Sequence, residues 1–258
     1  MSQQQGPTDP PSRALANQLR RDIADGTLAP GDKLPSERAL AARNGIARNT
    51  AREAVRILAE GGLVDAQHGR GVFVRKRPRL FRFGHSRYSR SVRERTGLSP
   101  FRAEVLAQGR TPTVQCTSID VLPAPDFVSE RLELPKGTPV VRRENWYRAD
   151  DEPLQVGYTY IPREVAGDTL LAKSANLGPG SLYARFEDQG FPITHTREEI
   201  TARMPTPQEC QSLAIPDGVP VIDHIHTSLT EGGLPFEVTH FIIRADLNGL
   251  DYTMPVDL

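Results

Sequence analysis

Three short helical patterns, followed by two apolar runs around a glycine-bearing turn, constrain the fold of this chain more than any other feature. Leu15, Leu19 and Ile23 recur at four-residue spacing before Gly26, and Ser36 is placed to cap a second helix. The pattern predicts helices over residues 13–25, 37–44 and 47–60 and a hairpin over residues 63–74. Three helices with a tight turn between the last two and a terminal hairpin form a winged helix-turn-helix, which we expect over residues 12–76.

The third predicted helix carries a polar face that suits DNA. Its N-terminal end presents Arg48, Asn49 and Arg52. Arginine can bond the edge of guanine through two hydrogen bonds, and asparagine can do the same for adenine. Thr50 could reach a phosphate beside the helix N-terminus, and His68 at the hairpin tip could enter the minor groove. A protein-interaction module whose arginine face is merely solvated stays open as the alternative.

Three motifs in this region are ordered and closely spaced: residues 34–38 (LPSER), 48–52 (RNTAR) and 68–74 (HGRGVFV). Together they resemble the DNA-binding domain of GntR-family regulators. We predict the following DNA contacts: Ser36, Arg38, Arg48, Asn49, Thr50, Arg52, His68 and Gly69. The family usually has Ser or Thr where Ala47 stands, so the resemblance implies DNA binding without naming the operator sequence.

The formal net charge of zero conceals a split between the front and the rear of the chain. Residues 1–98 hold 19 Lys and Arg against 9 Asp and Glu, whereas the remaining residues hold 13 against 23. A basic front part attracts a polyanion, because neutralised phosphates release counterions. We therefore expect two domains with different partners, with a chance asymmetry of surface charge as the alternative.

Composition bounds the class of protein. Hydrophobic residues make up 38% and charged residues 25% of the 258 residues, which is typical of a soluble globular chain. No apolar run approaches the roughly 20 residues that span a bilayer, and the Gln- and Pro-rich residues 1–11 are expected to form a disordered tail. Cys116 and Cys210 show no metal or redox spacing. We expect a cytoplasmic protein with no membrane contact, no metal and no cofactor.

Residues 77–99 are rich in arginine, with Phe81, Phe83 and Tyr88 interspersed. We predict a basic linker here. Two interpretations stay open: a disordered hinge that touches DNA, or a segment packed against the domain that follows.

An internal repeat organises the rear of the chain. Residues 134–141 (LPKGTPVV) parallel residues 215–222 (IPDGVPVI), and each copy predicts a strand, a short helix and a hairpin. The second short helix begins with a capping box from Thr206 to Glu209. The expected hairpins join residues 140–148 to 154–161 and residues 221–229 to 236–244, and a further helix is expected over residues 181–188. The repeat predicts an α+β domain over residues 100–258, with two similar halves around an antiparallel sheet.

Four short motifs carry a second resemblance: residues 149–153 (ADDEP), 160–162 (YIP), 235–237 (PFE) and 244–246 (RAD). With the layout above, they resemble the UTRA effector domain of the HutC subfamily of GntR regulators, which is related in fold to chorismate lyase. This resemblance implies an effector-binding and dimerisation domain. A small-molecule site is expected in a cleft between the two halves.

Strand alternation and the resemblance together give the predicted effector contacts: Arg102, Asn145, Tyr147, Gln155, Thr159, Tyr183, His224 and Glu237. Taken one by one, each of these residues is more typical of a structural role than of ligand binding. Many sugar-phosphate-sensing relatives place an Arg-x-Arg pair where this chain has Asn145 and Tyr147, which argues against a simple sugar phosphate. Arg102, Arg142 and Arg143 would supply positive charge if they face inward.

Three functions compete at this point. An enzyme is one, because the fold resemblance reaches a lyase, and a metal site on His224 and His226 is a related possibility. A purely architectural DNA-binding protein is another, although such a protein would not need the second domain over residues 100–258. We favour a homodimeric regulator, more often a repressor in such families. It would bind a pseudo-palindromic double-stranded operator and respond to a small-molecule effector of unknown identity.

Overall fold

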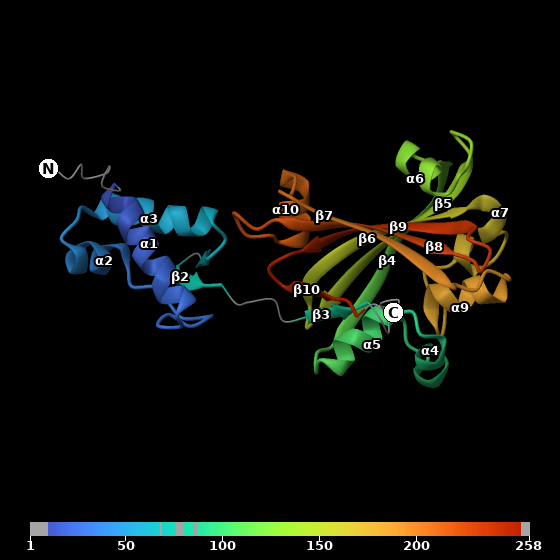
Figure 1. Cartoon of the computed structure of the whole chain (residues 1–258), viewed down its shortest axis with the longest axis horizontal. Helices are drawn as coiled ribbons and strands as arrows, with labels where there is room; N and C mark the ends of the chain where they lie inside the picture. Colours follow the sequence, from blue (N-terminus) through green and yellow to red (C-terminus); the bar gives the residue numbers. More distant parts are fainter. Residues whose placement is uncertain (1–9, 68, 76–79, 85–86, 254–258) are drawn as a thin grey trace, which may run out of the picture. The chain divides into compact units, whose positions relative to one another are not determined.

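The structure is a computed structural model that describes residues 10–67, 69–75, 80–84 and 87–253 (Figure 1). The chain divides into two compact units, the first mainly residues up to 77 and the second mainly residues from 78 onward. The predicted tail before residue 10, the wing-tip residue His68 and residues 76–79 lie outside the described residues.

The first unit is a three-helix domain with a hairpin. It contains α1 (Pro11–Ala24), α2 (Glu37–Asn44), α3 (Arg48–Glu60), β1 (Val64–Gln67) and β2 (Gly71–Val74). The two strands are antiparallel, with Val64 opposite Val74 and Gln67 opposite Gly71. The predicted winged helix-turn-helix is therefore confirmed.

Local sequence explains how α2 and α3 are set against each other. The Ser36 Oγ accepts a hydrogen bond from the backbone N–H of Ala39 at 3.2 Å, as its capping position predicts. Gly45 ends α2 with a φ of 62°, a left-handed conformation that favours glycine. Ala51 and Ala54 of α3 are fully buried, and their small side chains let α3 pack closely against the core. The opposite face of α3 is left exposed.

Six antiparallel strands form the sheet of the second unit, in the order β4-β5-β6-β9-β8-β7 (Figure 1). The strands are β4 (Pro112–Pro123), β5 (Pro139–Ala149), β6 (Glu152–Pro162), β7 (His195–Arg203), β8 (Val221–Leu229) and β9 (Pro235–Arg244). The order is symmetric about the central β6-β9 pair, in which Thr159 lies opposite Thr239. The sequence repeat is thus a structural repeat, and the predicted α+β class is confirmed.

Each half of the sheet has a short helix between its first strand and its hairpin. These helices are α6 (Asp126–Arg131) and α10 (Pro207–Leu213). The backbone N–H of Thr206 donates to Glu209 Oε2 at 2.8 Å, and the N–H of Glu209 donates to Thr206 Oγ1 at 3.2 Å. These are the two reciprocal bonds of the predicted capping box.

Further helices accompany the sheet: α4 (Arg90–Thr96), α5 (Pro100–Ala107), α7 (Arg163–Ala166), α8 (Leu170–Lys173) and α9 (Ser181–Asp188). The phenyl ring of Phe101 in α5 packs edge-on against Tyr147 of β5, with ring centroids 5.0 Å apart. Arg143, Asn145 and Tyr147 share the face of β5 to which this helix packs. Functional side chains on that face are therefore sheltered by helices.

The linker predicted over residues 77–99 is corrected from residue 80 onward. Strand β3 (Leu80–Phe83) pairs in parallel with β10 (Asn248–Asp251), and Arg82 and Arg93 are both only 7% exposed. The arginines that suggested a solvated linker meet carboxylates of the second unit instead, in the pairs Arg82–Glu198, Arg87–Glu104 and Arg93–Glu187. Of the two interpretations left open, the structure has residues 80–84 and 87–99 packed against the second domain.

Candidate functional site

The exposed face of α3 carries the residues predicted to contact DNA. Arg48, Asn49 and Arg52 are exposed, and Thr50 is half-buried. Arg38 in α2 is also exposed. Three to four residues separate neighbours on one helix face, so Arg48 and Arg52 lie one turn apart on the same side.

Glu37 holds both of these arginines. Its carboxylate oxygen Oε2 accepts from Arg48 Nε at 3.3 Å, and Oε1 accepts from Arg52 Nε at 3.2 Å. Hydrogen bonding to Arg52, supported by Arg48, keeps the pKa of Glu37 below its ordinary value. Glu37 belongs to the LPSER motif, but the sequence offered no reason to pair it with the third helix.

The N-terminus of α3 is open. Ala47 occupies the capping position and makes no side-chain capping bond, although its carbonyl accepts from the N–H of Thr50 at 3.0 Å. Such a helix end favours an anion such as a phosphate. In the wing, Gly69 is exposed and has a φ of 71°, a turn conformation that favours glycine.

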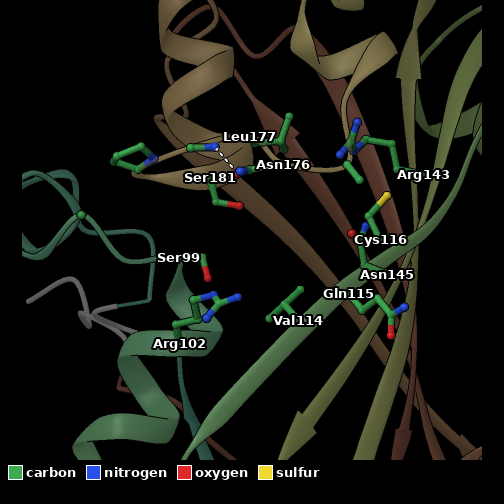
Figure 2. A pocket seen from close by; sticks show the side chains of 14 residues that line it. Ser99, Arg102, Val114, Gln115, Cys116, Arg143, Asn145, Asn176, Leu177 and Ser181 are labelled. Carbon is green, nitrogen blue, oxygen red and sulfur yellow. Dashed lines mark hydrogen bonds between the residues drawn. The ribbon is translucent and has the colours of Figure 1, made fainter.

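A cavity of about 630 Å³ opens on the sheltered face of the second unit (Figure 2). Arg102 reaches toward it from α5, Ser181 and Leu177 border it from the start of α9 and the loop before it, and Asn145 and Arg143 lie on the side of the sheet. Its remaining lining residues are Gly97, Ser99, Val114, Gln115, Cys116, Ala175, Asn176, Gly178 and Pro179. No described lining residue of this cavity is acidic.

Two guanidinium groups give the cavity its charge. Arg143 is 1% exposed and donates to the backbone carbonyls of Leu171 at 2.7 Å and Ser174 at 2.8 Å. Burial lowers the pKa of Arg143. Arg102 and Arg143 line the cavity, and no Asp or Glu is among its described lining residues. Two cations without an acidic neighbour in the lining favour an anionic occupant.

A smaller chamber of about 60 Å³ adjoins the cavity. Tyr147, Thr159, Tyr183, Thr239 and Phe241 line it, and it shares Asn145, Arg143 and Ser181 with the larger cavity. Burial raises the pKa of Tyr147 to about 12, so its hydroxyl stays protonated at neutral pH. The chamber offers aromatic walls and hydroxyl groups.

The structure brings together five of the eight predicted effector contacts at this cavity and its chamber. They are Arg102, Asn145, Tyr147, Thr159 and Tyr183. Gln155, His224 and Glu237 are buried elsewhere on the same face and line neither space. Arg143 faces inward, as a source of positive charge for the cavity must, whereas Arg142 bonds Ser118 and Glu144 on the opposite face. Strand alternation explains this difference between neighbours.

Glu237 lies in a buried chain of polar side chains behind the chamber. Thr239 Oγ1 is 2.7 Å from Thr159 Oγ1 and donates to Glu237. Ser228 Oγ donates to Glu237 Oε2 at 2.6 Å, and His226 Nε2 is 3.0 Å from Ser228 Oγ. Burial raises the pKa of Glu237. Its carboxyl is therefore committed to neighbouring hydroxyls and lies behind the chamber wall.

The buried series of hydrogen-bonded side chains that contains Glu237 ends at Glu198 in β7. His226 Nδ1 is 2.9 Å from Glu198 Oε1, the Tyr88 hydroxyl donates to that oxygen at 2.8 Å, and His224 contacts Oε2. Arg82 Nη1 is 2.8 Å from His224 Nδ1. Burial, with a contribution from Arg82, lowers the pKa of His224 to about 4. The histidine pair that suggested a metal is thus engaged in hydrogen bonds that join β3, β7 and β8.

Sequence reasoning missed several cavity residues, among them Ser99, Gln115, Cys116, Asn176 and Ser181. Two of them carried a readable signal. Ser99-Pro100 and Gly180-Ser181 are the cap and first residue of α5 and α9, and helix N-termini are common places for binding anions.

Comparison with known proteins decides the family. The model of the bacterial regulatory proteins of the gntR family matches residues 11–74, and that of the UTRA domain matches residues 107–247. The chain belongs to the GntR family. As a GntR regulator with a UTRA domain, it is a DNA-binding transcriptional regulator of the HutC type, and its rear domain is of the effector-binding kind.

Relatives align with this GntR regulator over most of its length. The HTH-type transcriptional regulator Rv0792c of Mycobacterium tuberculosis is 33% identical over 95% of this chain and 86% of that protein. The HTH-type transcriptional repressor NagR of Bacillus subtilis is 27% identical over 90% of this chain and 89% of that protein. The crystal structure of a GntR-family transcriptional regulator covers 96% of this chain and 99% of its own, with a TM-score of 0.67 and 26% identity.

Two further properties of the described ranges bear on other kinds of site. Among these residues, no helix is long and apolar enough to cross a membrane. No three His, Cys, Asp or Glu side chains of the described ranges are grouped to hold a metal ion.

Proposed function

We propose that this GntR regulator reads a double-stranded operator with α3 and that an anion in the rear cavity changes its affinity for that operator. The observation that carries the proposal is the pair of arginine sites. One is the exposed row of Arg48 and Arg52 on the helix, and the other is the sheltered pair of Arg102 and Arg143 in the cavity. The first suits a base edge in the major groove, and the second suits a small carboxylate or phosphate.

The DNA contacts that we propose are those predicted from the sequence. Arg48 and Arg52 would contact bases, and Asn49 would join them where adenine is present. Thr50 and the open N-terminus of α3 would contact phosphate, as would Arg38. Ser36 supports this surface as the cap of α2, and the wing around Gly69 would follow the adjacent groove.

We propose an anionic effector with a small apolar or hydroxylated part. The missing Arg-x-Arg pair argued against a simple sugar phosphate, but Arg102 and Arg143 bring positive charge from other positions. Asn145 and Ser181 add hydrogen-bonding groups beside that charge, and Tyr147 and Tyr183 line the inner chamber. A carboxylate or phosphate group would therefore bind in the outer part, with the rest of the molecule directed inward.

We propose a homodimer that represses transcription in the cytoplasm. The first unit of each subunit (mainly residues up to 77), which we call the head, would bind one half of a pseudo-palindromic operator. The support is similarity alone: NagR and the mannosyl-D-glycerate system repressor MngR of Escherichia coli, which is 25% identical over 91% of this chain, are both named repressors. We propose regulation rather than catalysis, because Rv0792c, NagR and MngR are all named as regulators or repressors.

The test begins with selection of binding sequences from random DNA by the full chain, followed by gel-shift titration. We expect Arg48→Ala combined with Arg52→Ala to abolish sequence-specific binding, and Arg56→Ala on the next turn to serve as a matched control. Unchanged specific affinity in the double variant would overturn the assignment of α3. A thermal-shift panel of carboxylates, phosphates and uncharged sugars then tests the cavity. Stabilisation by uncharged compounds only would overturn the anionic effector.

A further inference from the structure

We propose that Glu37 positions Arg48 and Arg52 for end-on recognition of guanine and thereby sets the selectivity of the head for its operator. This inference rests on the proposed reading of DNA by α3. The carboxylate of Glu37 lies between the two guanidinium groups and accepts from the Nε of each.

The bonding pattern leaves the ends of both arginines available. A guanidinium has five N–H donors, one on Nε and four on the two terminal nitrogens. Arg48 Nε lies 3.3 Å from Glu37 Oε2, and Arg52 Nε lies 3.2 Å from Oε1 and 3.3 Å from Oε2. Within the described residues, the salt bridges of both arginines are to Glu37 and are made through Nε. With Nε engaged, the two terminal nitrogens remain to bond guanine O6 and N7 together.

Exposure agrees with this arrangement. The side chains of Arg48 and Arg52 are 67% and 59% exposed, whereas that of Glu37 is 28% exposed. The carboxylate is thus partly covered, and the two guanidinium groups stand beyond it. Glu37 lies in the first turn of α2, where a negative charge is favoured by the helix dipole. Its pKa is held low by Arg52 and Arg48, so the carboxylate is ionised at neutral pH.

Electrostatics gives Glu37 two effects on selectivity. Arg48 and Arg52 are four residues apart on one helix and repel each other, and the carboxylate between them removes that repulsion and fixes both side chains. A carboxylate beside the DNA surface also weakens attraction to phosphates of any sequence. The first effect acts only where the correct bases are present, whereas the second weakens binding to every sequence, so together they raise the ratio of operator affinity to random-DNA affinity.

The experiment compares Glu37→Gln and Glu37→Ala with the control Glu53→Gln in the full chain. Glu53 lies on α3, whereas Glu37 lies on α2, and it pairs with Arg56. This control therefore removes one negative charge from the same head and leaves the arginine row intact. Each variant is titrated against the selected operator and against random DNA at two salt concentrations. Binding to random DNA also reports that the head is folded.

We expect random-DNA binding to strengthen to a similar extent in all three variants, because each loses one negative charge. The ratio of operator affinity to random-DNA affinity should fall roughly tenfold in Glu37→Ala. It should fall less in Glu37→Gln, whose amide oxygen can still accept one bond, and beyond the charge effect it should not change in Glu53→Gln.

Two results would overturn the inference. Equal ratios in the Glu37 and Glu53 variants would show that Glu37 contributes charge alone. A changed base preference at one operator position, with selectivity retained elsewhere, would show that Glu37 contacts a base directly. A wild-type chain that enriches no DNA sequence would overturn the proposed function itself, whereas an enriched operator with unaffected Glu37 variants would overturn only the inference.

Discussion

Replacing His224 should remove a large part of the acid sensitivity of this GntR regulator. His224 is fully buried, with Arg82 on Nδ1 and Glu198 on Nε2. The neutral ring with its proton on Nε2 satisfies both neighbours, since Nδ1 then accepts from Arg82 and Nε2 donates to Glu198. In the imidazolium, Nδ1 also carries a proton, which would face the guanidinium of Arg82 and place two positive charges side by side in the buried core. This explains why burial, with Arg82, lowers the pKa of His224 to about 4.

The magnitude follows from linkage. The ordinary pKa of 6.5 applies in the unfolded chain, so that state takes up a proton before the folded state does. Stability from the neutral ring is present above pH 6.5 and is lost as the pH falls toward 4. The full loss is about 3 kcal/mol, of which about 2 kcal/mol falls between pH 7 and pH 5. Glu198, whose pKa is lowered by its histidine and Arg82 partners, adds its own loss only below about pH 4.5.

Urea unfolding of the wild type and His224→Gln at pH 7 and pH 5 measures this difference. The variant should be less stable at pH 7 because it loses buried hydrogen bonds, but it should lose about 2 kcal/mol less than the wild type on acidification. His195→Gln is the matched control, because His195 is exposed on β7. An identical loss in wild type and His224→Gln would refute the reasoning.

Three further outcomes are expected. Thr206→Ala should lower the free energy of unfolding by about 1 kcal/mol in urea titration, because it removes half of the capping box, and an unchanged value would contradict that role. Leu58→Ala should cost about 2–5 kcal/mol, because Leu58 is fully buried in the head, and calorimetry should show the loss. Arg143→Met should abolish anion-induced thermal stabilisation and also lower basal stability by about 2 kcal/mol or more, because it strands the carbonyls of Leu171 and Ser174; retained anion stabilisation would contradict the cavity assignment.

The head could be predicted from the sequence because its signals are local. Ser36, Gly45 and the small residues Ala51 and Ala54 each act within one or two turns of their own helix. The repeat of the rear domain was also readable, since each half is a contiguous strand, helix and hairpin. Local rules therefore recovered both domains and the capping box at Thr206.

The predictions that were wrong concern residues whose environment depends on contacts between distant segments. Arg82, Arg87 and Arg93 look like a solvated basic run, and only their carboxylate partners, 17 to 116 residues away, show that they are buried. Glu237 and His224 share a face with the cavity, but alternation cannot tell which part of a face is open and which lies behind a wall. Arg143 was recognised as a source of charge, and only the structure shows that it faces inward.

The central claim is that an anion bound at Arg102 and Arg143 changes the affinity of α3 for its operator. Fluorescence anisotropy of the selected operator, titrated with the full chain with and without the anion that the thermal-shift panel identifies, tests it most directly. We expect the wild-type dissociation constant to change by about fivefold or more, and that of Arg102→Met, tested at the same anion concentration, to stay unchanged. An unchanged wild-type affinity, or an equal change in Arg102→Met, would contradict the account.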